Sequence, residues 1–331
     1  MSGPDQDASS GTSVGIGVLG GGSFVARRAV LPAIDAAHGA HLVAISSRSG
    51  SVAAPWADRS VPDYTDVLAH PEVDAVYLPL PNGLHEEWTI KAAIAGKHVL
   101  CEKPLAPTCE AAVRMADACR AHGVLLAEAW MTPFDLRWQR ILADVESGVI
   151  GEVDRVDARF TFTIVADGAD NYRWIPEQGG GALLDVGIYT LGLPTALWGT
   201  DVEQVIVRDR ISAESGVDAR TDAELVWPDG RRAHIVCSFV DDEVQRVSVA
   251  GSGGAVTANG DAFTGGAAAR DHHVATGESR TVSGPGGDPY VAMVEAFARS
   301  VRGDEAWPRP IDDAVAMLRL LERIEREPVT P

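Results

Sequence analysis

A lysine, an aspartate and a tyrosine stand in this sequence where they could handle a proton. Lys103 lies in VLCEKPLA (99–106), directly after three apolar residues that resemble the end of a buried strand, and Pro104 prevents a regular helix from beginning there. Asp185 and Tyr189 lie in GGGALLDVGIY (179–189). If the chain is helical from Ala182, their i, i+4 spacing puts a carboxylate and a phenol on one face. The three preceding glycines would let a ligand approach that face, although a helix-capping aspartate and a half-buried tyrosine would give the same pattern.

A second pattern, VGIGVLGGGSFVARR (14–28), places glycines between an apolar strand and a helix. Gly20 would form the tight turn and Gly22 would let the backbone approach a pyrophosphate, which the N–H groups of the helix N-terminus would bind. The third position of the usual fingerprint is Val25, which is large for close packing, and neighbouring Ala26 is the alternative. A plain tight turn is the other interpretation; the strand-turn-helix context favours a dinucleotide site.

The end of the second expected strand bears on which nicotinamide cofactor is bound. An acidic residue there would hold a ribose hydroxyl and repel a 2′-phosphate. The sequence instead has AISSRSGS (44–51), with Ser46, Ser47, Arg48 and Ser49. Hydroxyls and a guanidinium suit a phosphate, so we expect NADP(H) rather than NAD(H). A solvated turn with an incidental arginine is the alternative.

The elements that would position these residues alternate in the first half of the chain. Short apolar strands are expected at 14–19, 41–46, 73–78, 98–101 and 124–127, with helical segments between them. One of these helices runs through Ile34, with Pro32 as a kink or early stop, and another covers 108–122 with Thr108 as its N-cap. This alternation predicts a doubly wound parallel sheet of the Rossmann type.

After about residue 132 the pattern changes to that of an α+β domain with an open-faced, mainly antiparallel sheet. Residues 152–164 alternate with the period of a strand, and Asp229-Gly230 between two further strands predicts a hairpin. Residues 251–288, rich in Gly, Ala and Ser, are expected to be irregular, and two helices, 290–301 and 311–326, close the chain. The expected organisation is a disordered tail (1–13), a Rossmann dinucleotide-binding domain (14–131) and a substrate-binding and oligomerisation domain (132–331).

Composition excludes several classes of partner and site. The net charge of −19 argues against nucleic acid and anionic membranes, and no apolar run is long enough for a membrane span. The N-terminus lacks the regions of a signal peptide, and the four cysteines have no C-x-x-C pairing, which favours reduced thiols in the cytoplasm. No cluster has metal-ligand spacing, and the pair His272-His273 is expected on an exposed loop. We therefore expect no metal.

Taken together, these segments resemble the Gfo/Idh/MocA family of oxidoreductases, and most closely its dihydrodiol and xylose dehydrogenase-like branch. The resemblance extends from Val14 to the last helix. It rests on the glycine turn, VDAVYLPLPNGLH (73–85), AGKHVLCEKPLA (95–106), EAWM (128–131) and GGGALLDVGIY, in this order.

The resemblance implies roles for named residues. Lys103, Tyr189 and Asp185 would be catalytic, with Tyr189 as the general acid/base, its pKa lowered by Lys103, and Asp185 orienting the substrate or the lysine. Pro104 would follow a cis peptide bond, Glu102 would lie near the nicotinamide ribose, and the loop from Pro79 to His85 would pass under the cofactor. The residues expected to bind the cofactor are Gly20, Gly22, Ser23, Phe24, Ser47, Arg48, Ser49, Pro79, Leu80, Asn82, His85, Glu102 and Lys103.

The substrate site departs from the family pattern. Relatives often follow the EAWM position with an aromatic-Arg-x-His-Pro run, whereas this chain has MTPFDLRWQ (131–139). The substrate of a relative therefore cannot be transferred directly. Trp130, Arg173, Trp174, Asp185 and Tyr189 are the residues expected to line the substrate site, although Arg173 and Trp174 could equally be loop residues that pack a domain edge.

The sequence thus predicts a cytoplasmic homodimer or homotetramer, associated through the open sheet face. It would transfer hydride between NADP(H) and a hydroxyl or keto carbon of a sugar, sugar derivative or cyclic diol. Two alternatives stay open. One is a nucleotide-sugar keto-reductase of secondary metabolism; the other is a non-catalytic NADP-sensing or partner-binding protein on the same fold.

Overall fold

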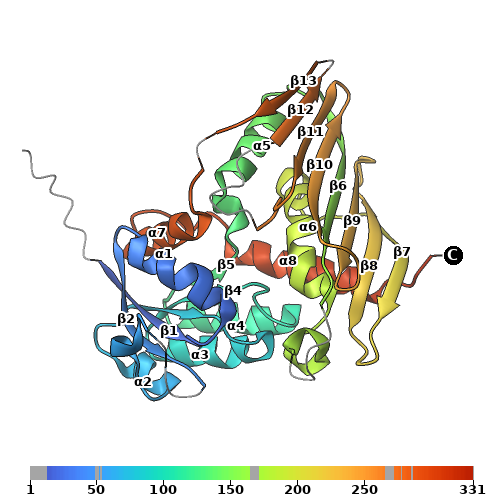
Figure 1. The fold of residues 1–331 in the computed structure, drawn as a ribbon. Helices are drawn as coiled ribbons and strands as arrows, with labels where there is room; N and C mark the ends of the chain where they lie inside the picture. Colours follow the sequence, from blue (N-terminus) through green and yellow to red (C-terminus); the bar gives the residue numbers. More distant parts are fainter. Residues whose placement is uncertain are drawn as a thin grey trace, which may run out of the picture.

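Two sheets organise the molecule. The computed structural model describes residues 13–48, 52, 54–164, 171–264, 272–276, 278–284 and 286–330. A five-stranded sheet with its helices forms one part, and an eight-stranded sheet stands beside it with helix α6 between the two (Figure 1). No helix in the described residues is long and apolar enough to cross a membrane.

The five-stranded sheet is parallel throughout, with the strand order β2-β1-β3-β4-β5. The order reverses between β1 and β3, and a crevice at the carboxyl ends of such strands is where α/β sheets bind ligands. This sheet confirms the predicted Rossmann-type fold. Its strands are β1 (Val14–Leu19), β2 (Ala40–Ser46), β3 (Ala75–Leu78), β4 (His98–Glu102) and β5 (Leu126–Ala129). Its helices are η1 (Ala26–Val30, a π-helical turn), α1 (Leu31–Ala36), α2 (Tyr64–Ala69), α3 (His85–Ile94) and α4 (Cys109–Ala121).

Local sequence explains most of these boundaries. Every residue of β1, β3 and β5 is buried, as expected for strands covered on both faces. The Thr108 hydroxyl accepts the N–H of Ala111 at 3.2 Å and so caps α4, and Gly123 has a positive φ of 66° after that helix ends. An early stop at Pro32 is wrong, because α1 continues past it to Ala36. Pro32 lies in the first turn of α1, and the π-helical turn directly before α1 makes the helical segment irregular beside it.

The eight-stranded sheet is mainly antiparallel, as predicted, with one parallel pair, β6 and β9. Gly230, with a φ of 88°, turns the chain between β8 and β9 where the Asp-Gly dipeptide predicts a hairpin. The strands are β6 (Val153–Thr161), β7 (Gln204–Ser212), β8 (Asp218–Val226), β9 (Arg232–Ser238), β10 (Val244–Gly251), β11 (Gly254–Asn259), β12 (His272–Thr276) and β13 (Glu278–Val282).

Strands β11 to β13 correct the expectation that residues 251–288 are irregular. The inward positions Val256, Ala258 and Val274 are buried and continue the face that β10 begins. Tertiary pairing therefore overrides the weak local preference of a Gly- and Ala-rich segment. His272 is also not on an exposed loop. It is buried on β12, and its Nε2 lies 2.6 Å from the Asp144 carboxylate of α5.

The helices of the second half connect the two sheets. They are α5 (Leu136–Glu146), α6 (Ala182–Trp198), α7 (Pro289–Arg302) and α8 (Ile311–Arg326). Helix α6 packs on the inner face of the eight-stranded sheet, whereas α7 and α8 return to the first sheet, where they lie against α1 and α4 (Figure 1). The outer face of the second sheet carries alternating charges, such as Arg155, Asp157 and His234, and no helix of the described residues covers it (Figure 1).

Candidate active site

The segments expected to bind the cofactor and the segment expected to carry the catalytic lysine meet at one edge of the parallel sheet. Because all five strands run in the same direction, the glycine turn, the serine-arginine segment, the Pro79 loop and the Glu-Lys-Pro step all follow carboxyl ends at that edge. The turn and the loop are neighbours: a Cβ placed on Gly20 would lie 3.2 Å from the Pro79 carbonyl oxygen. This juxtaposition occurs at the point where the strand order reverses.

The glycine turn fits a pyrophosphate. Gly20 has a φ of 112°, and a side chain on Gly21 would clash with Ile45 at 2.4 Å. In contrast, a Cβ on Gly22 would meet, among the residues that the structure describes, only the Ser47 Cβ, at 3.9 Å, so these residues leave the space over Gly22 open. Ala26 is fully buried whereas Val25 is half-buried, so Ala26 makes the close helix packing that Val25 could not.

The end of β2 presents one cation to this edge. Ser46 and Ser47 are buried, whereas Arg48 is exposed. Burial raises the pKa of the Tyr64 phenol, at the start of α2, and the charge of Arg48 counteracts that rise, which places the guanidinium beside Tyr64. Ser49 lies outside the described residues.

Lys103 and Asp185 form a buried ion pair that joins the two halves of the chain. The lysine Nζ donates to the Asp185 backbone oxygen at 2.9 Å and to its Oδ1 at 3.0 Å. Arg173 Nε donates to the other carboxylate oxygen at 2.7 Å. Burial alone would raise the pKa of Asp185, but the two cations outweigh it and lower the value to about 2. Asp185 is therefore ionised at neutral pH, and Lys103 stays charged beside it.

Tyr189 lies one helical turn from Asp185, as the i, i+4 spacing predicts. The Lys103 Nζ is 4.8 Å from the centre of its ring, and the ring packs edge-on against Phe160. The predicted lowering of the Tyr189 pKa by Lys103 is wrong. Burial raises the pKa well above its usual value, and the charges of Glu102 and Asp185 raise it further, while the lysine charge is engaged by Asp185. The phenol is therefore protonated at rest.

The three glycines before α6 pack against other atoms of the protein and do not face open space. A Cβ on Gly180 would lie 2.6 Å from the Arg173 carbonyl oxygen, and one on Gly181 would lie 2.4 Å from Asp218 Oδ1. Asp218 Oδ2 accepts the Leu183 N–H at 2.9 Å and so caps α6 from a neighbouring strand. The expectation that these glycines admit a ligand is therefore replaced by a packing role: they set the start of the helix that carries Asp185.

Asn82 and His85 hold the loop after β3 through backbone groups. Asn82 Nδ2 donates to the Gly179 oxygen at 3.0 Å, which ties this loop to the glycines. His85 is fully buried, and its ring nitrogens lie 2.9–3.2 Å from the carbonyl oxygens of Leu80, Pro104 and Leu105. The Lys103–Pro104 peptide bond is cis, as the resemblance implies. These contacts favour a positioning role for both residues; direct cofactor contact stays a prediction.

Two tryptophans of the predicted substrate site have different surroundings. Trp130 is buried, its ring meets Tyr189 edge-on with centroids 6.4 Å apart, and its Nε1 has no hydrogen-bond partner among the described residues. Trp174 packs edge-on against Phe239, which directly follows β9, with ring centroids 5.5 Å apart. Phe24 is 74% exposed beside the glycine turn, with Arg28 near its ring.

The predicted site omits three tyrosines that the fold brings to Glu102. Tyr77 on β3 donates to Glu102 Oε1 at 2.6 Å. Tyr172 and Tyr290 are close enough that the charge of Glu102 raises their phenol pKa values, after the larger effect of burial. The residue in the sequence that could have indicated this cluster is Tyr77, a phenol in an otherwise aliphatic buried strand.

Glu102 should make stability depend on pH. Burial raises its pKa from 4.5 to about 7, against the lowering effect of the Tyr77 hydrogen bond. The folded state thus holds a proton that the unfolded chain releases, and stability falls as the pH rises from about 4.5 to 7, by about 3 kcal/mol in total. Glu102→Gln cannot ionise, so its melting temperature relative to the native protein should be higher at pH 8 than at pH 5. Glu110→Gln, a surface carboxylate change on α4, is the control; an equal response of both variants would contradict the prediction.

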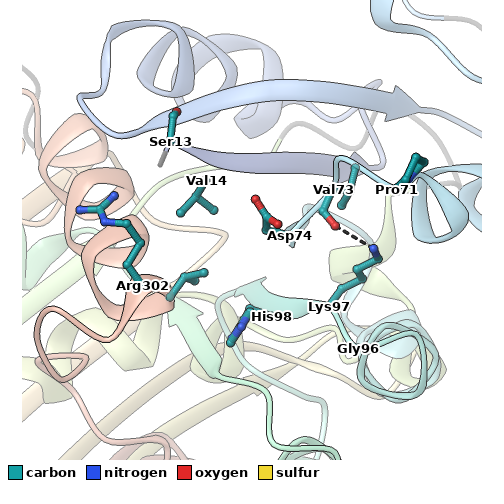
Figure 2. Close-up of a pocket in the computed structure, with 10 residues that line it drawn as sticks. Ser13, Val14, Pro71, Val73, Asp74, Gly96, Lys97, His98 and Arg302 are labelled. Atoms are coloured by element: carbon teal, nitrogen blue, oxygen red, sulfur yellow. Dashed lines mark hydrogen bonds between the residues drawn. The ribbon is translucent and has the colours of Figure 1, made fainter. Parts of the chain in front are cut away.

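A hollow of about 480 Å³ lies at the opposite edge of the same sheet, where Val14, Asp74 and His98 surround the amino ends of the strands (Figure 2). Its charged groups have partners. The Lys97 ammonium donates to the Val73 oxygen at 2.7 Å, and Asp74 accepts the Gly15 N–H at 2.8 Å. None of the predicted catalytic residues lines it, and no group of metal-ligating side chains occurs in the described residues.

Comparison with known proteins agrees with this arrangement. The family model described as "Oxidoreductase family, NAD-binding Rossmann fold" matches residues 14–129, and the "GFO/IDH/MocA C-terminal domain" matches 138–257. The chain is 34% identical to a D-xylose 1-dehydrogenase (NADP(+)) of Haloferax volcanii, covering 93% of this chain and 95% of that one. It is also 34% identical to a dTDP-3,4-didehydro-2,6-dideoxy-alpha-D-glucose 3-reductase of Streptomyces violaceoruber, covering 94% and 93%.

Solved structures give the same result. A 3-ketoreductase from Actinomadura kijaniata, in complex with NADP and TDP-benzene, superposes with a TM-score of 0.87 at 29% identity, over 97% of this chain and 100% of that one. The two matched domains, their order and the near-complete coverage confirm the resemblance seen in the motifs. The chain belongs to the Gfo/Idh/MocA family of oxidoreductases.

Proposed function

We propose that the protein is an NADP(H)-dependent oxidoreductase that acts on a hydroxyl or keto carbon of a sugar or sugar derivative. The observation that carries the proposal is the Lys103–Asp185 ion pair beside the protonated Tyr189, at the sheet edge that also holds the open glycine turn. Relatives named as an NADP(+)-dependent xylose dehydrogenase and as sugar 3-reductases support the cofactor and the substrate class.

The residues divide the chemistry as follows. The nicotinamide, when bound, would supply or accept the hydride. Tyr189, with a raised pKa, would donate its phenolic proton to the oxygen of a carbonyl substrate. The Lys103 ammonium, fixed by two contacts to Asp185, would stabilise the negative charge that develops on that oxygen. Arg173 holds the second oxygen of Asp185, so the carboxylate cannot rotate away from the lysine.

A turnover screen tests this proposal. Purified protein would be assayed for NADPH oxidation with ketoses and keto-sugars, and for NADP⁺ reduction with pentoses, hexoses, inositol-type polyols and cyclic diols. Turnover with at least one carbohydrate is expected. Tight NADPH binding without turnover across the panel would instead support the sensing or partner-binding alternative.

A nucleotide-sugar keto-reductase is the second candidate. It is favoured by the match to the ketoreductase solved with TDP-benzene, and the altered segment 131–139 leaves it open. The two candidate functions differ in whether a nucleotide should compete with the substrate for the active site. Thymidine diphosphate should inhibit a nucleotide-sugar enzyme at low concentration and leave an enzyme for free sugars unaffected.

Cofactor choice gives a direct prediction. NADPH should bind at least about tenfold more tightly than NADH, because one charge-assisted contact to phosphate contributes about 1.5–3 kcal/mol. Arg48→Asp should narrow or reverse that difference, as measured by fluorescence titration with both cofactors. Arg120→Asp makes the same charge change on exposed α4 and should leave the ratio unchanged. Equal affinity of the native protein for both cofactors would refute the assignment.

We further propose that the protein is cytoplasmic and associates through the outer face of the eight-stranded sheet. The four cysteines are free and buried, which suits a reducing compartment. The outer face presents ion pairs such as Arg155–Asp157 and a buried Glu224 between Arg208 and Arg232. Light scattering would give the oligomeric state, and charge reversal at Arg159, on the same face, would test the surface.

A further inference from the structure

The catalytic loop is held from two sides by buried side chains. His85 faces the carbonyl oxygens of Pro104 and Leu105, and Glu128 Oε1 accepts the Leu105 N–H at 2.9 Å. Glu128 on β5 is the strand partner of Cys101 on β4, and its side chain is only 3% exposed. The peptide groups immediately after Lys103 are therefore fixed by a carboxylate that itself needs a cation.

Arg309 supplies that cation from the segment between α7 and α8. Its Nη1 donates to Glu128 Oε2, and its guanidinium carbon lies 4.9 Å from the centre of the Trp130 ring. Trp130 also meets the ring of Tyr189 edge-on. One arginine thus touches two residues, of which Glu128 holds the loop after Lys103 and Trp130 packs against Tyr189.

The backbone around Arg309 is rigid for reasons visible in the sequence. Pro308 and Pro310 flank it, so the φ angles on both sides are fixed and the arginine itself is restricted to extended conformations. Trp307 anchors the segment by packing against Phe134 with ring centroids 5.3 Å apart. The Arg309 side chain is 15% exposed, so solvent competes little for its contacts.

We propose that Arg309 is a positioning residue for the reaction, acting through Glu128 on the Lys103 loop and through Trp130 on Tyr189. The inference rests on the proposed function, because the loop and the tyrosine matter as a pair only if they serve one reaction. Neither Glu128 nor Arg309 needs to touch substrate or cofactor for this role. Their effect is on the placement of Lys103 and Tyr189, to which turnover is steeply sensitive.

The test compares Arg309→Gln with Arg309→Lys. Arg309→Gln removes both contacts and should lower kcat per folded molecule by about 10–10²-fold, with the Kd for NADPH changed by less than about threefold. Arg309→Lys keeps a positive charge beside Glu128 but loses the guanidinium contact with Trp130. Its kcat should therefore lie between that of Arg309→Gln and that of the native protein. Arg299→Gln, an exposed arginine of α7 that pairs with Glu305, is the matched control and should keep native kcat. Native kcat in folded Arg309→Gln would overturn the proposal.

A second readout does not depend on turnover. Hydrogen exchange of the peptide that contains Leu105 should be faster in Arg309→Gln than in the native protein and unchanged in Arg299→Gln, because the Glu128 acceptor is no longer fixed. If the native protein turns over no carbohydrate, the proposed function fails, and this readout still decides whether Arg309 fixes the loop. Unchanged exchange there would also overturn the proposal.

Discussion

Tyr189→Phe should lower kcat by about 10²–10⁴-fold, the usual contribution of a positioned general acid or base. The change deletes one phenolic proton and keeps the ring that packs against Phe160 and Trp130. Melting temperature and NADPH affinity should therefore stay near native. Steady-state kcat, measured together with both of these quantities, separates loss of proton donation from loss of folding.

The pH dependence of the same variant provides a further check. The native profile should contain a limb at high pH from the Tyr189 phenol, whose pKa burial raises well above its usual value. Tyr189→Phe should lose that limb. A folded, NADPH-binding variant with near-native kcat would refute the assignment of Tyr189 as the proton donor.

Lys103→Met should abolish most turnover, by about 10²–10⁴-fold in kcat, because it removes the cation that would stabilise charge on the reacting oxygen. Cofactor affinity should change little, since the glycine turn and Arg48 are untouched. Some stability should also be lost, because Asp185 stays buried with Arg173 as its remaining cation.

Lys97→Met is the matched control for this variant. Lys97 directly precedes β4 and donates to backbone oxygens, but it lies at the amino edge of the sheet, by the hollow of Figure 2. Its kcat per folded molecule should be native. If both lysine variants lost turnover equally, the effect would be on folding, and Lys103 would have no special part in the reaction.

Much of the fold could be predicted because its signals are local. Alternating apolar strands and helices define the parallel sheet, and residues such as Thr108, Gly123 and the Asp229-Gly230 turn mark element ends. Strands β11 to β13 could not be predicted in this way. Their order comes from pairing with β10, a long-range contact that leaves little trace in a segment rich in Gly and Ala.

Two parts of the candidate site could be predicted from local sequence: Lys103, from its place after a strand, and the pair Asp185 and Tyr189, from their spacing on a helix. Properties of the site that depend on several distant residues could not be predicted. The pKa of Tyr189 is raised by burial and by the charges of Glu102 and Asp185, against the lowering effect of Arg173. Likewise, nothing in the local sequence connects Gly181 with Asp218 across 37 positions, although their contact fixes where α6 begins.

Helix α6 combines poor intrinsic helicity with the residues proposed for catalysis, Asp185 and Tyr189. It contains Gly187, Gly192 and Pro194, and a glycine inside a helix is less favourable than alanine by about 1 kcal/mol. At position 192, however, a Cβ would lie 2.6 Å from Cη2 of Trp130, the ring that abuts Tyr189.

This glycine therefore belongs to a trade-off between stability and activity. Replacing helical glycines with alanine is a standard route to thermostability, but at position 192 it would displace the tryptophan that packs against Tyr189. Engineering for robustness should therefore leave the glycines of α6 unchanged.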